Sequence, residues 1–287
     1  PVSFKNELDF ALEPTLTEVT LQEEMEVKEA KQTGKVTILD FGQNFAGIVE
    51  INPSFLTNET ITIRHGEILN ADGSLYTSNL RKAKATIIYH AGAEKKKYRP
   101  RFTYMGFRYM ELSGVDYQSG MIKAYALHTD MKRTGYFSCE NPMVQKLYEN
   151  QVWGQKSNYV EVPTDCPQRD ERMGWTGDAQ VFSPTATYLK DTYTFYAKYL
   201  YDMAKEQRVL GGKVPDVVPS CGVESTACVW GDASCIIPWN LYLFYGDKSI
   251  LEDQFESMKS WVDYIRKVDG EHHGWRHSFH YGDWLAL

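Results

Sequence analysis

The stretch Asn141-Pro-Met-Val-Gln-Lys-Leu-Tyr148 marks the point at which the character of this chain changes. An asparagine followed by a proline predicts the start of a helix, because the asparagine side chain can cap the first turn and Pro142 suits its first position. The apolar residues that follow recur at helical spacing on one face: Val144, Leu147, Tyr148 and Val152.

Upstream of Asn141 the apolar residues alternate instead with polar ones, which is typical of half-buried strands. This pattern covers residues 19–27 and 61–63, and further strands are predicted at 83–90 and 107–112. Residues 39–47 are typical of a strand end followed by a glycine-bounded turn. Several short strands at this spacing predict a β-sandwich.

Downstream of Asn141 the helical spacing continues. Apolar stripes at 193–204 and 250–265 predict two long helices, and shorter helices are expected at about 179–189 and 233–245. We therefore predict a multidomain fold, β then α: residues 1–34 as an N-terminal strand segment, 35–135 as a β-sandwich domain, and 136–287 as a helical domain. We do not regard these five or so helices as a finished helical domain. The chain also ends in an apolar stretch, which would normally be covered by other parts of a protein, so we expect a fragment of a longer protein.

The composition excludes several classes of protein. The formal net charge is −7, which argues against a duplex-DNA-binding protein. The longest apolar stretch, residues 235–245, is too short for a membrane span. Aromatic residues make up 14% of the chain, which suits large cores and pockets that stack on sugars. Neither the compartment nor the oligomeric state of a soluble protein of this kind follows from these numbers.

Cysteine and histidine spacing argues against a metal centre. The five cysteines are an odd number at irregular intervals, so mostly reduced thiols are expected. The seven histidines form no paired spacing on a predicted helix, and His272, His273 and His277 are better explained by a solvated loop. We expect no metal and no other cofactor.

One segment gathers charged side chains beside an aromatic one: Asp165-Cys-Pro-Gln-Arg-Asp-Glu171-Arg-Met-Gly-Trp175-Thr-Gly-Asp178. It has neither helical nor strand periodicity, so we expect a structured loop, which is where sites are commonly built. Paired carboxylates can serve as acid and base in the hydrolysis of a glycosidic bond.

Each of these acids also has a purely structural interpretation. Asp178 could cap the helix that follows it. Asp165 could accept a hydrogen bond in an Asx-turn before Pro167. Glu171 could form an exposed ion pair, which contributes little to stability.

The segment 165–178 resembles the signature of the bacterial α-L-rhamnosidases, glycoside hydrolase family 78. The upstream stretches Asp40-Phe-Gly-Gln-Asn-Phe-Ala-Gly47, Arg64-His-Gly-Glu67 and Pro100-Arg-Phe-Thr-Tyr-Met-Gly-Phe-Arg108 resemble the β-sandwich of that family. Trp230-Gly-Asp232 and Gly282-Asp-Trp284 resemble two further motifs. The resemblance runs from about residue 35 to the end of the chain.

This resemblance implies a fold and a set of roles. The helical part would be an incomplete (α/α)6 toroid, and hydrolysis would invert the anomeric centre. Glu171 would be the catalytic general acid, with neighbouring carboxylates and an apolar wall favouring its protonated form. The substrate-binding positions implied by the family are Asp165, Trp175, Asp178, Trp230 and Trp284. For Trp230 and Trp284 an interpretation as core tryptophans stays open.

The general base of the family has no counterpart motif in this sequence. Glu224 is a weak candidate, and we expect the base to lie beyond the 287 residues. The expected activity is the release of terminal α-L-rhamnose from a rhamnose-containing glycoside or polysaccharide. Two alternatives are a non-catalytic carbohydrate-binding homologue and another (α/α)6 glycosidase.

Overall fold

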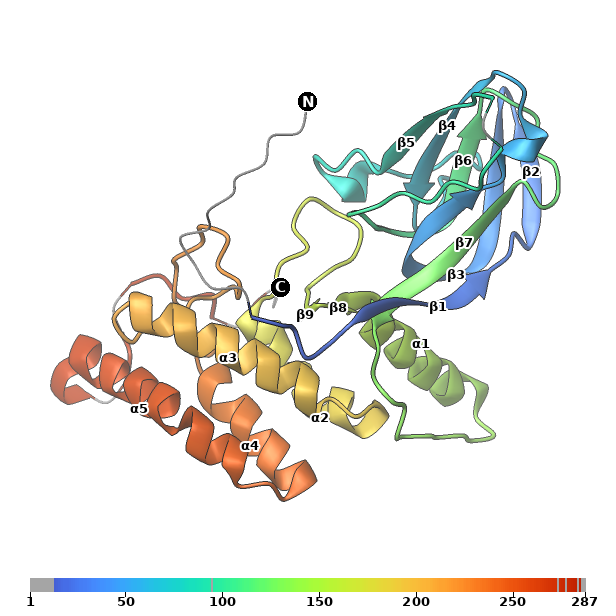
Figure 1. Cartoon of the computed structure of the whole chain (residues 1–287). Coiled ribbons are helices and arrows are strands. Elements are labelled where there is room, and N and C mark those ends of the chain that lie inside the picture. Colours follow the sequence, from blue (N-terminus) through green and yellow to red (C-terminus); the bar gives the residue numbers. More distant parts are fainter. Residues whose placement is uncertain (1–12, 94, 273, 277, 283, 285–287) are drawn as a thin grey trace.

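The structure is a computed structural model that describes residues 13–93, 95–272, 274–276, 278–282 and 284 of the chain. It has a β part followed by a helical part (Figure 1), which confirms the predicted order. The main strands are β1 (Val19–Met25), β2 (Glu29–Thr33), β3 (Val36–Ile51), β4 (Thr60–Gly66), β5 (Thr86–His90), β6 (Met105–Ser113) and β7 (Ile122–Thr129). Two short strands, β8 (Tyr159–Val160) and β9 (Val162–Pro163), and the helices α1 (Pro142–Asn158), α2 (Thr176–Leu189), α3 (Tyr193–Val209), α4 (Ala233–Tyr245) and α5 (Ser249–Asp269) follow.

The seven main strands form one antiparallel sheet in the order β1-β7-β3-β6-β4-β5, with β2 paired to β3. The long strand β3 bends, and its pairing with β6 shifts register between Asp40 and Phe45. Its first half pairs with β2 and its second half with β7, so a single strand joins two parts of a curled sheet. The glycine-bounded turn predicted for residues 42–47 was therefore wrong: the chain bends within the strand, where Gly42 has a φ of 76° that a side chain would disfavour.

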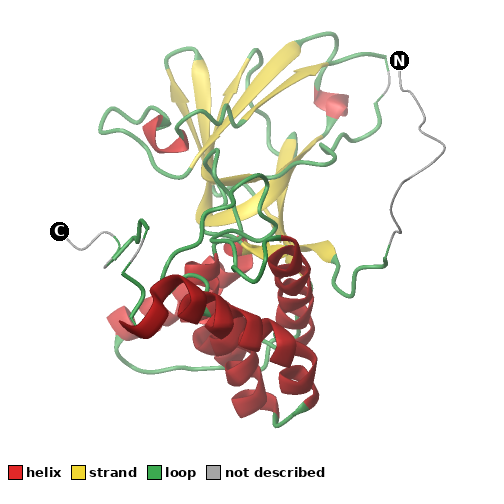
Figure 2. Cartoon of the chain, turned by 90° about the vertical axis from the view of Figure 1, so that its left-hand side faces the viewer, coloured by secondary structure: helices red, strands yellow, loops and turns green. Residues whose placement is uncertain are grey.

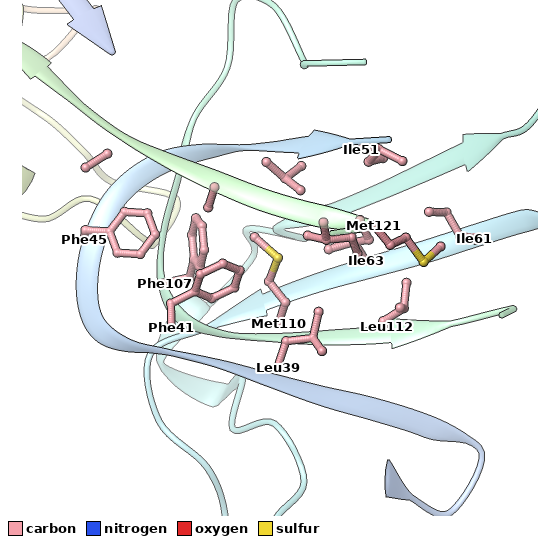
Figure 3. Close-up of a cluster of buried hydrophobic side chains, with 14 of the residues drawn as sticks. Leu39, Phe41, Phe45, Ile51, Ile61, Ile63, Phe107, Met110, Leu112 and Met121 are labelled. Atoms are coloured by element: carbon pink, nitrogen blue, oxygen red, sulfur yellow. The ribbon is translucent and has the colours of Figure 1, made fainter. Parts of the chain in front are cut away.

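The core of the β domain fills the inside of this curl (Figure 3). Phe41 and Phe45 flank the bend and both contact Phe107 of β6, with ring centroids 5.7 and 4.6 Å away. All three side chains are buried. Burial of such rings stabilises the bend, since each contributes about 1.5–3 kcal/mol when it leaves water.

The residues of 13–34 that form strands belong to the same sheet. β1 pairs with β7, and β2 pairs with β3. Residues 1–12 lie outside the described residues, and the boundaries between the predicted domains stay a prediction.

Helix α1 begins as predicted. The Asn141 side chain accepts hydrogen bonds from the backbone N–H groups of Met143 and Val144, and Pro142 occupies the first turn. The helix packs on β3 and β7. Its predicted apolar face is only partly covered in this chain: Val152 is buried, whereas Val144 and Leu147 are exposed.

The other helices pack mainly on one another, α4 against α2, α3 and α5. The stripe predicted for residues 193–204 is confirmed as the buried face of α3, and Trp261 of α5 is buried beside it. Figure 2 shows the strands on one side of the molecule and the helices on the other, with loops between them. Residues of both parts of the chain meet at these loops, in the site described below.

Two further observations concern the cysteines and the possibility of a membrane span. All five cysteines are free thiols. Among the helices that the structure describes, none combines the length and the apolar character needed to cross a membrane.

Candidate active site

The loop 164–175 connects β9 to α2, and hydrogen bonds of Asp165 link the two ends of this loop. The backbone N–H of Asp165 donates to the Met173 carbonyl at 3.1 Å, and the Met173 N–H donates back to the Asp165 carboxylate at 2.9 Å. The Asp165 side chain also accepts from Arg169 at 3.0 Å and is only 7% exposed. Asp165 therefore stabilises the whole loop through Met173, rather than an Asx-turn at Pro167.

Glu171 lies inside this loop with its carboxylate held from three sides. Its Oε1 accepts a hydrogen bond from the indole N–H of Trp175 at 2.9 Å. Its Oε2 accepts one from Arg81 at 2.8 Å and lies 2.9 Å from the guanidinium of Arg169. At 18% side-chain exposure, Glu171 is not the exposed surface ion pair considered above.

The charges nearest to Glu171 differ from those that the sequence predicted. Carboxylates were expected as its neighbours, and Asp165 does share Arg169 with it. Two guanidinium groups, however, lie in direct contact with Glu171. Cations favour the ionised form of a carboxylate and stabilise the negative charge that remains when an acid gives up its proton.

Asp178 lies in the first turn of α2, three residues beyond the N-cap position, which Trp175 occupies. The capping role considered for it was therefore wrong. Desolvation by the surrounding protein raises the pKa of Asp178, although its side chain is exposed on one side, and the charges of Asp165 and Glu171 add to the increase. Asp165 and Asp178 line a common cavity of about 340 Å³.

Tyr281 brings the three predicted tryptophans together. Its ring lies 6.0 Å from Trp175, 4.4 Å from Trp230 and 5.4 Å from Trp284, measured between centroids. Its hydroxyl donates to Asp216 at 3.2 Å. Sequence analysis missed Tyr281, although it immediately precedes the motif that contains Trp284.

The tryptophans differ in how they are covered. Trp175 and Trp230 are half-buried, and Trp284 is exposed. Trp230 lies against the start of α2: a Cβ placed on Gly177 would lie 2.7 Å from the Trp230 indole. A glycine at this position thus allows the close approach between helix and indole. Asp283, the middle residue of the motif around Trp284, lies outside the described residues.

The β domain supplies polar side chains that the sequence analysis did not assign. Glu67 accepts hydrogen bonds from Asn44 at 2.9 Å and from Asn79 at 3.1 Å. Burial raises the pKa of the Glu67 carboxyl. Glu67 and Asn44 line a cavity of about 460 Å³ together with Asp165 and Arg169 of the loop 164–175. Glu67 and Asn44 lie in the stretches that resemble the family, so this resemblance could have identified them. Arg81 lies outside those stretches.

In the described part of the chain, one group of side chains has the proximity that a metal site requires. Ligand atoms of Asp165, Cys166 and Glu171 lie within 4.8 Å of one another. The donor set does not suit a cation, because arginine already pairs with both carboxylates. Burial also raises the pKa of the Cys166 thiol to about 12, which disfavours the thiolate that a metal would bind. His273 and His277 lie outside the described residues.

Two protein-family models match this chain. Residues 132–287 match the bacterial alpha-L-rhamnosidase 6 hairpin glycosidase domain, and residues 30–128 match the bacterial alpha-L-rhamnosidase concanavalin-like domain. The chain thus joins a concanavalin-like β domain to a hairpin glycosidase domain. It belongs to the bacterial α-L-rhamnosidase family.

Individual relatives agree with this assignment. The chain is 41% identical over 257 residues to an alpha-L-rhamnosidase of Streptomyces avermitilis, covering 88% of this chain and 25% of that protein. It is 38% identical over 269 residues to one of Formosa agariphila, covering 91% of this chain and 28% of the relative. The chain therefore spans about a quarter of the length of the curated relatives it matches.

Solved structures show the same similarity. The Streptomyces avermitilis alpha-L-rhamnosidase complexed with L-rhamnose superposes with a TM-score of 0.87 at 39% identity, over 94% of this chain and 26% of that one. The alpha-L-rhamnosidase from Dictyoglumus thermophilum gives a TM-score of 0.83 at 36% identity, over 89% and 29% of the two chains.

Proposed function

We propose that this chain carries the acid-bearing part of an inverting α-L-rhamnosidase, which releases terminal α-L-rhamnose from a rhamnose-containing glycoside or polysaccharide. Glu171 is the general acid in this proposal. The observation that carries it is the fixed carboxylate of Glu171, held by Arg81, Arg169 and Trp175 beside two further acids. An acid must be positioned before it can transfer a proton efficiently.

The proposed reaction moves one proton from Glu171 to the glycosidic oxygen. The bond between that oxygen and the anomeric carbon breaks, and the leaving group departs as an alcohol. A water molecule adds to the opposite face of the sugar while a general base removes its proton. Glu171 is left as a carboxylate, whose charge the two guanidinium groups stabilise.

Of the remaining predicted residues, Asp178 and the tryptophans would bind the sugar. Asp178 has an exposed carboxylate that can accept hydrogen bonds from rhamnose hydroxyls, whereas that of Asp165 already accepts from Met173 and Arg169. The cluster of Trp175, Trp230, Trp284 and Tyr281 offers apolar faces to the C–H groups and the methyl group of a 6-deoxy sugar.

We propose that the base comes from a part of the enzyme outside these 287 residues, in keeping with the quarter of each relative that the chain spans. Glu224 is a poor candidate: it is exposed, and its backbone carbonyl accepts a hydrogen bond from Lys213 at 2.8 Å. The 287 residues expressed alone should therefore show no rhamnosidase activity. Turnover by this chain alone, abolished by Glu224→Gln, would contradict this part of the proposal.

The test is Glu171→Gln in the full-length enzyme. On a disaccharide, whose leaving group needs a proton, the rate should fall by on the order of 10²–10⁴, which is the usual contribution of a positioned acid. On p-nitrophenyl α-L-rhamnoside the loss should be much smaller. Glu224→Gln is the matched control and should leave both rates unchanged. Near wild-type activity of Glu171→Gln on the disaccharide would overturn the assignment.

A further inference from the structure

Arg81 reaches the candidate acid from the other domain. It follows the short 3-10 helix Ser78–Leu80 of the β domain and lies 90 residues before Glu171 in sequence. Its Nη1 donates to Glu171 Oε2 at 2.8 Å, and the next backbone N–H, of Lys82, donates to Asp170 at 3.4 Å. In Figure 1 the yellow loop before α2 rises toward this part of the β domain.

The backbone of Arg81 adopts a costly conformation at the point of this contact. Its φ is 55° and its ψ is −111°, a combination that residues with a Cβ rarely adopt. Leu80, immediately before it, is buried and anchors the segment in the β domain. Non-glycine residues in such conformations cluster at functional sites, because the surrounding structure must hold them there.

A second contact holds the loop on the same domain. Arg172, the residue after Glu171, donates to the backbone carbonyl of Tyr104 at 2.8 Å, and its guanidinium lies 4.7 Å from the Tyr104 ring centroid. Arg81 and Arg172 together attach the segment around Glu171 to the β domain. The β domain is thus in direct contact with the acid.

The two oxygens of Glu171 have different surroundings. Oε2 lies against two cations, Arg81 and Arg169, whereas Oε1 accepts a single neutral N–H from Trp175. A proton is repelled by neighbouring cations, so it binds more favourably to Oε1. Oε1 also keeps a lone pair that Trp175 does not use.

We propose that Arg81 is a positioning residue for the general acid: it holds Oε2 of Glu171 on the β domain so that Oε1 carries the proton to the glycosidic oxygen. This inference rests on the proposed role of Glu171. In the transfer, the O–H bond at Oε1 breaks and a new O–H bond forms on the leaving group. The negative charge left on the carboxylate is shared with Oε2, where Arg81 stabilises it.

The experiment uses Arg81→Ala and Arg81→Lys in the full-length enzyme with rhamnosides of graded leaving groups. A misplaced acid commonly costs up to about 10²-fold, so kcat/KM of Arg81→Ala should fall about 10- to 100-fold on a disaccharide and little on p-nitrophenyl α-L-rhamnoside. Arg81→Lys, which keeps the charge, should recover part of the loss. Arg64→Ala is the matched control, because it removes another arginine of the β domain whose partner is a glutamate, Glu111 at 2.8 Å.

The dependence of the loss on the leaving group is a readout that a merely structural role would not move. A partly unfolded enzyme would lose activity on every substrate alike, whereas a misplaced acid affects the leaving groups that need a proton. Arg64→Ala should leave the rates on all leaving groups unchanged.

A double variant separates this inference from the proposed function. If Arg81 acts through Glu171, Arg81→Ala should cause no further loss in the Glu171→Gln background. If Glu171→Gln itself shows no dependence on the leaving group, the proposed function fails. If Glu171→Gln shows that dependence but Arg81→Ala behaves like the wild type on every leaving group, Glu171 is still the acid and Arg81 does not position it.

Discussion

The indole N–H of Trp175 donates to Oε1 of Glu171 at 2.9 Å, and Trp175 is also the N-cap residue immediately before α2. Its backbone forms a β-bridge with Val217, and the next N–H, of Thr176, donates to the Asp216 carbonyl at 2.9 Å. These contacts hold the start of α2 in place. The hydrogen bond from Trp175 in turn holds the carboxylate of Glu171 relative to the helix.

Trp175→Phe should keep an aromatic wall and remove this hydrogen bond. A misplaced acid can cost about 10²-fold in rate, so kcat/KM on a disaccharide should fall by roughly 10- to 100-fold, with little change in melting temperature because the ring is kept. Trp239→Phe, at an exposed tryptophan of α4, is the control. A large fall in melting temperature with unchanged kinetics would instead favour a core role for Trp175.

Asp165→Asn should loosen the loop. The variant removes the charge that pairs with Arg169 at 3.0 Å, and the site is nearly buried. We expect a loss of about 1–3 kcal/mol in the free energy of unfolding, measured by urea denaturation of the full-length enzyme. Asp263→Asn breaks an exposed pair at the same sequence spacing, with Lys259, and should leave the free energy of unfolding nearly unchanged. Equal losses in the two variants would contradict the structural role of Asp165.

Gly177→Ala should displace Trp230. The added Cβ would lie 2.7 Å from the indole, so either the ring or α2 must shift. Such overpacking typically costs about 1–3 kcal/mol and should weaken rhamnose binding, measured by calorimetry. Gly154→Ala in α1 is the control, because no atom lies within 4 Å of its added Cβ. That variant should be neutral or stabilise the protein by up to about 1 kcal/mol.

His65 should make stability depend on pH. Burial lowers its pKa to about 4 from an ordinary value of 6.5, while its Nδ1 lies 2.8 Å from the Ala85 carbonyl. Between these two pH values the unfolded chain binds a proton that the folded chain does not, so stability is full above pH 6.5 and falls as the pH drops toward 4. The loss reaches about 3 kcal/mol.

The measurement for His65 is urea denaturation at several pH values between 4 and 7.5. His65→Gln should flatten the dependence in this window, whereas His90→Gln, at an exposed histidine, should leave it as it is. An unchanged slope in His65→Gln would show that other groups cause the acid sensitivity.

The start of α1 could be predicted because its cap and its first turn are neighbours in sequence. The start of α2 was placed too late, at about residue 179. The first N–H of the helix, that of Thr176, donates to the Asp216 carbonyl, and no side chain caps the helix, so no local signal marks Thr176. The bend of β3 was taken for a turn for a related reason: the bend is held by partners on β6 and β7, far away in the chain.

The sequence by itself determined the order of a β part and a helical part, the motif that carries Asp165, Glu171 and Asp178, and the family. These features depend on local periodicity and on a contiguous motif. The tertiary structure decided which groups surround Glu171. Arg81 comes from the other domain, and Tyr281 contacts Trp175 and Trp230, which lie in distant segments of the chain. Contacts of this kind arise only when packing brings remote segments together, and no spacing within one segment encodes them.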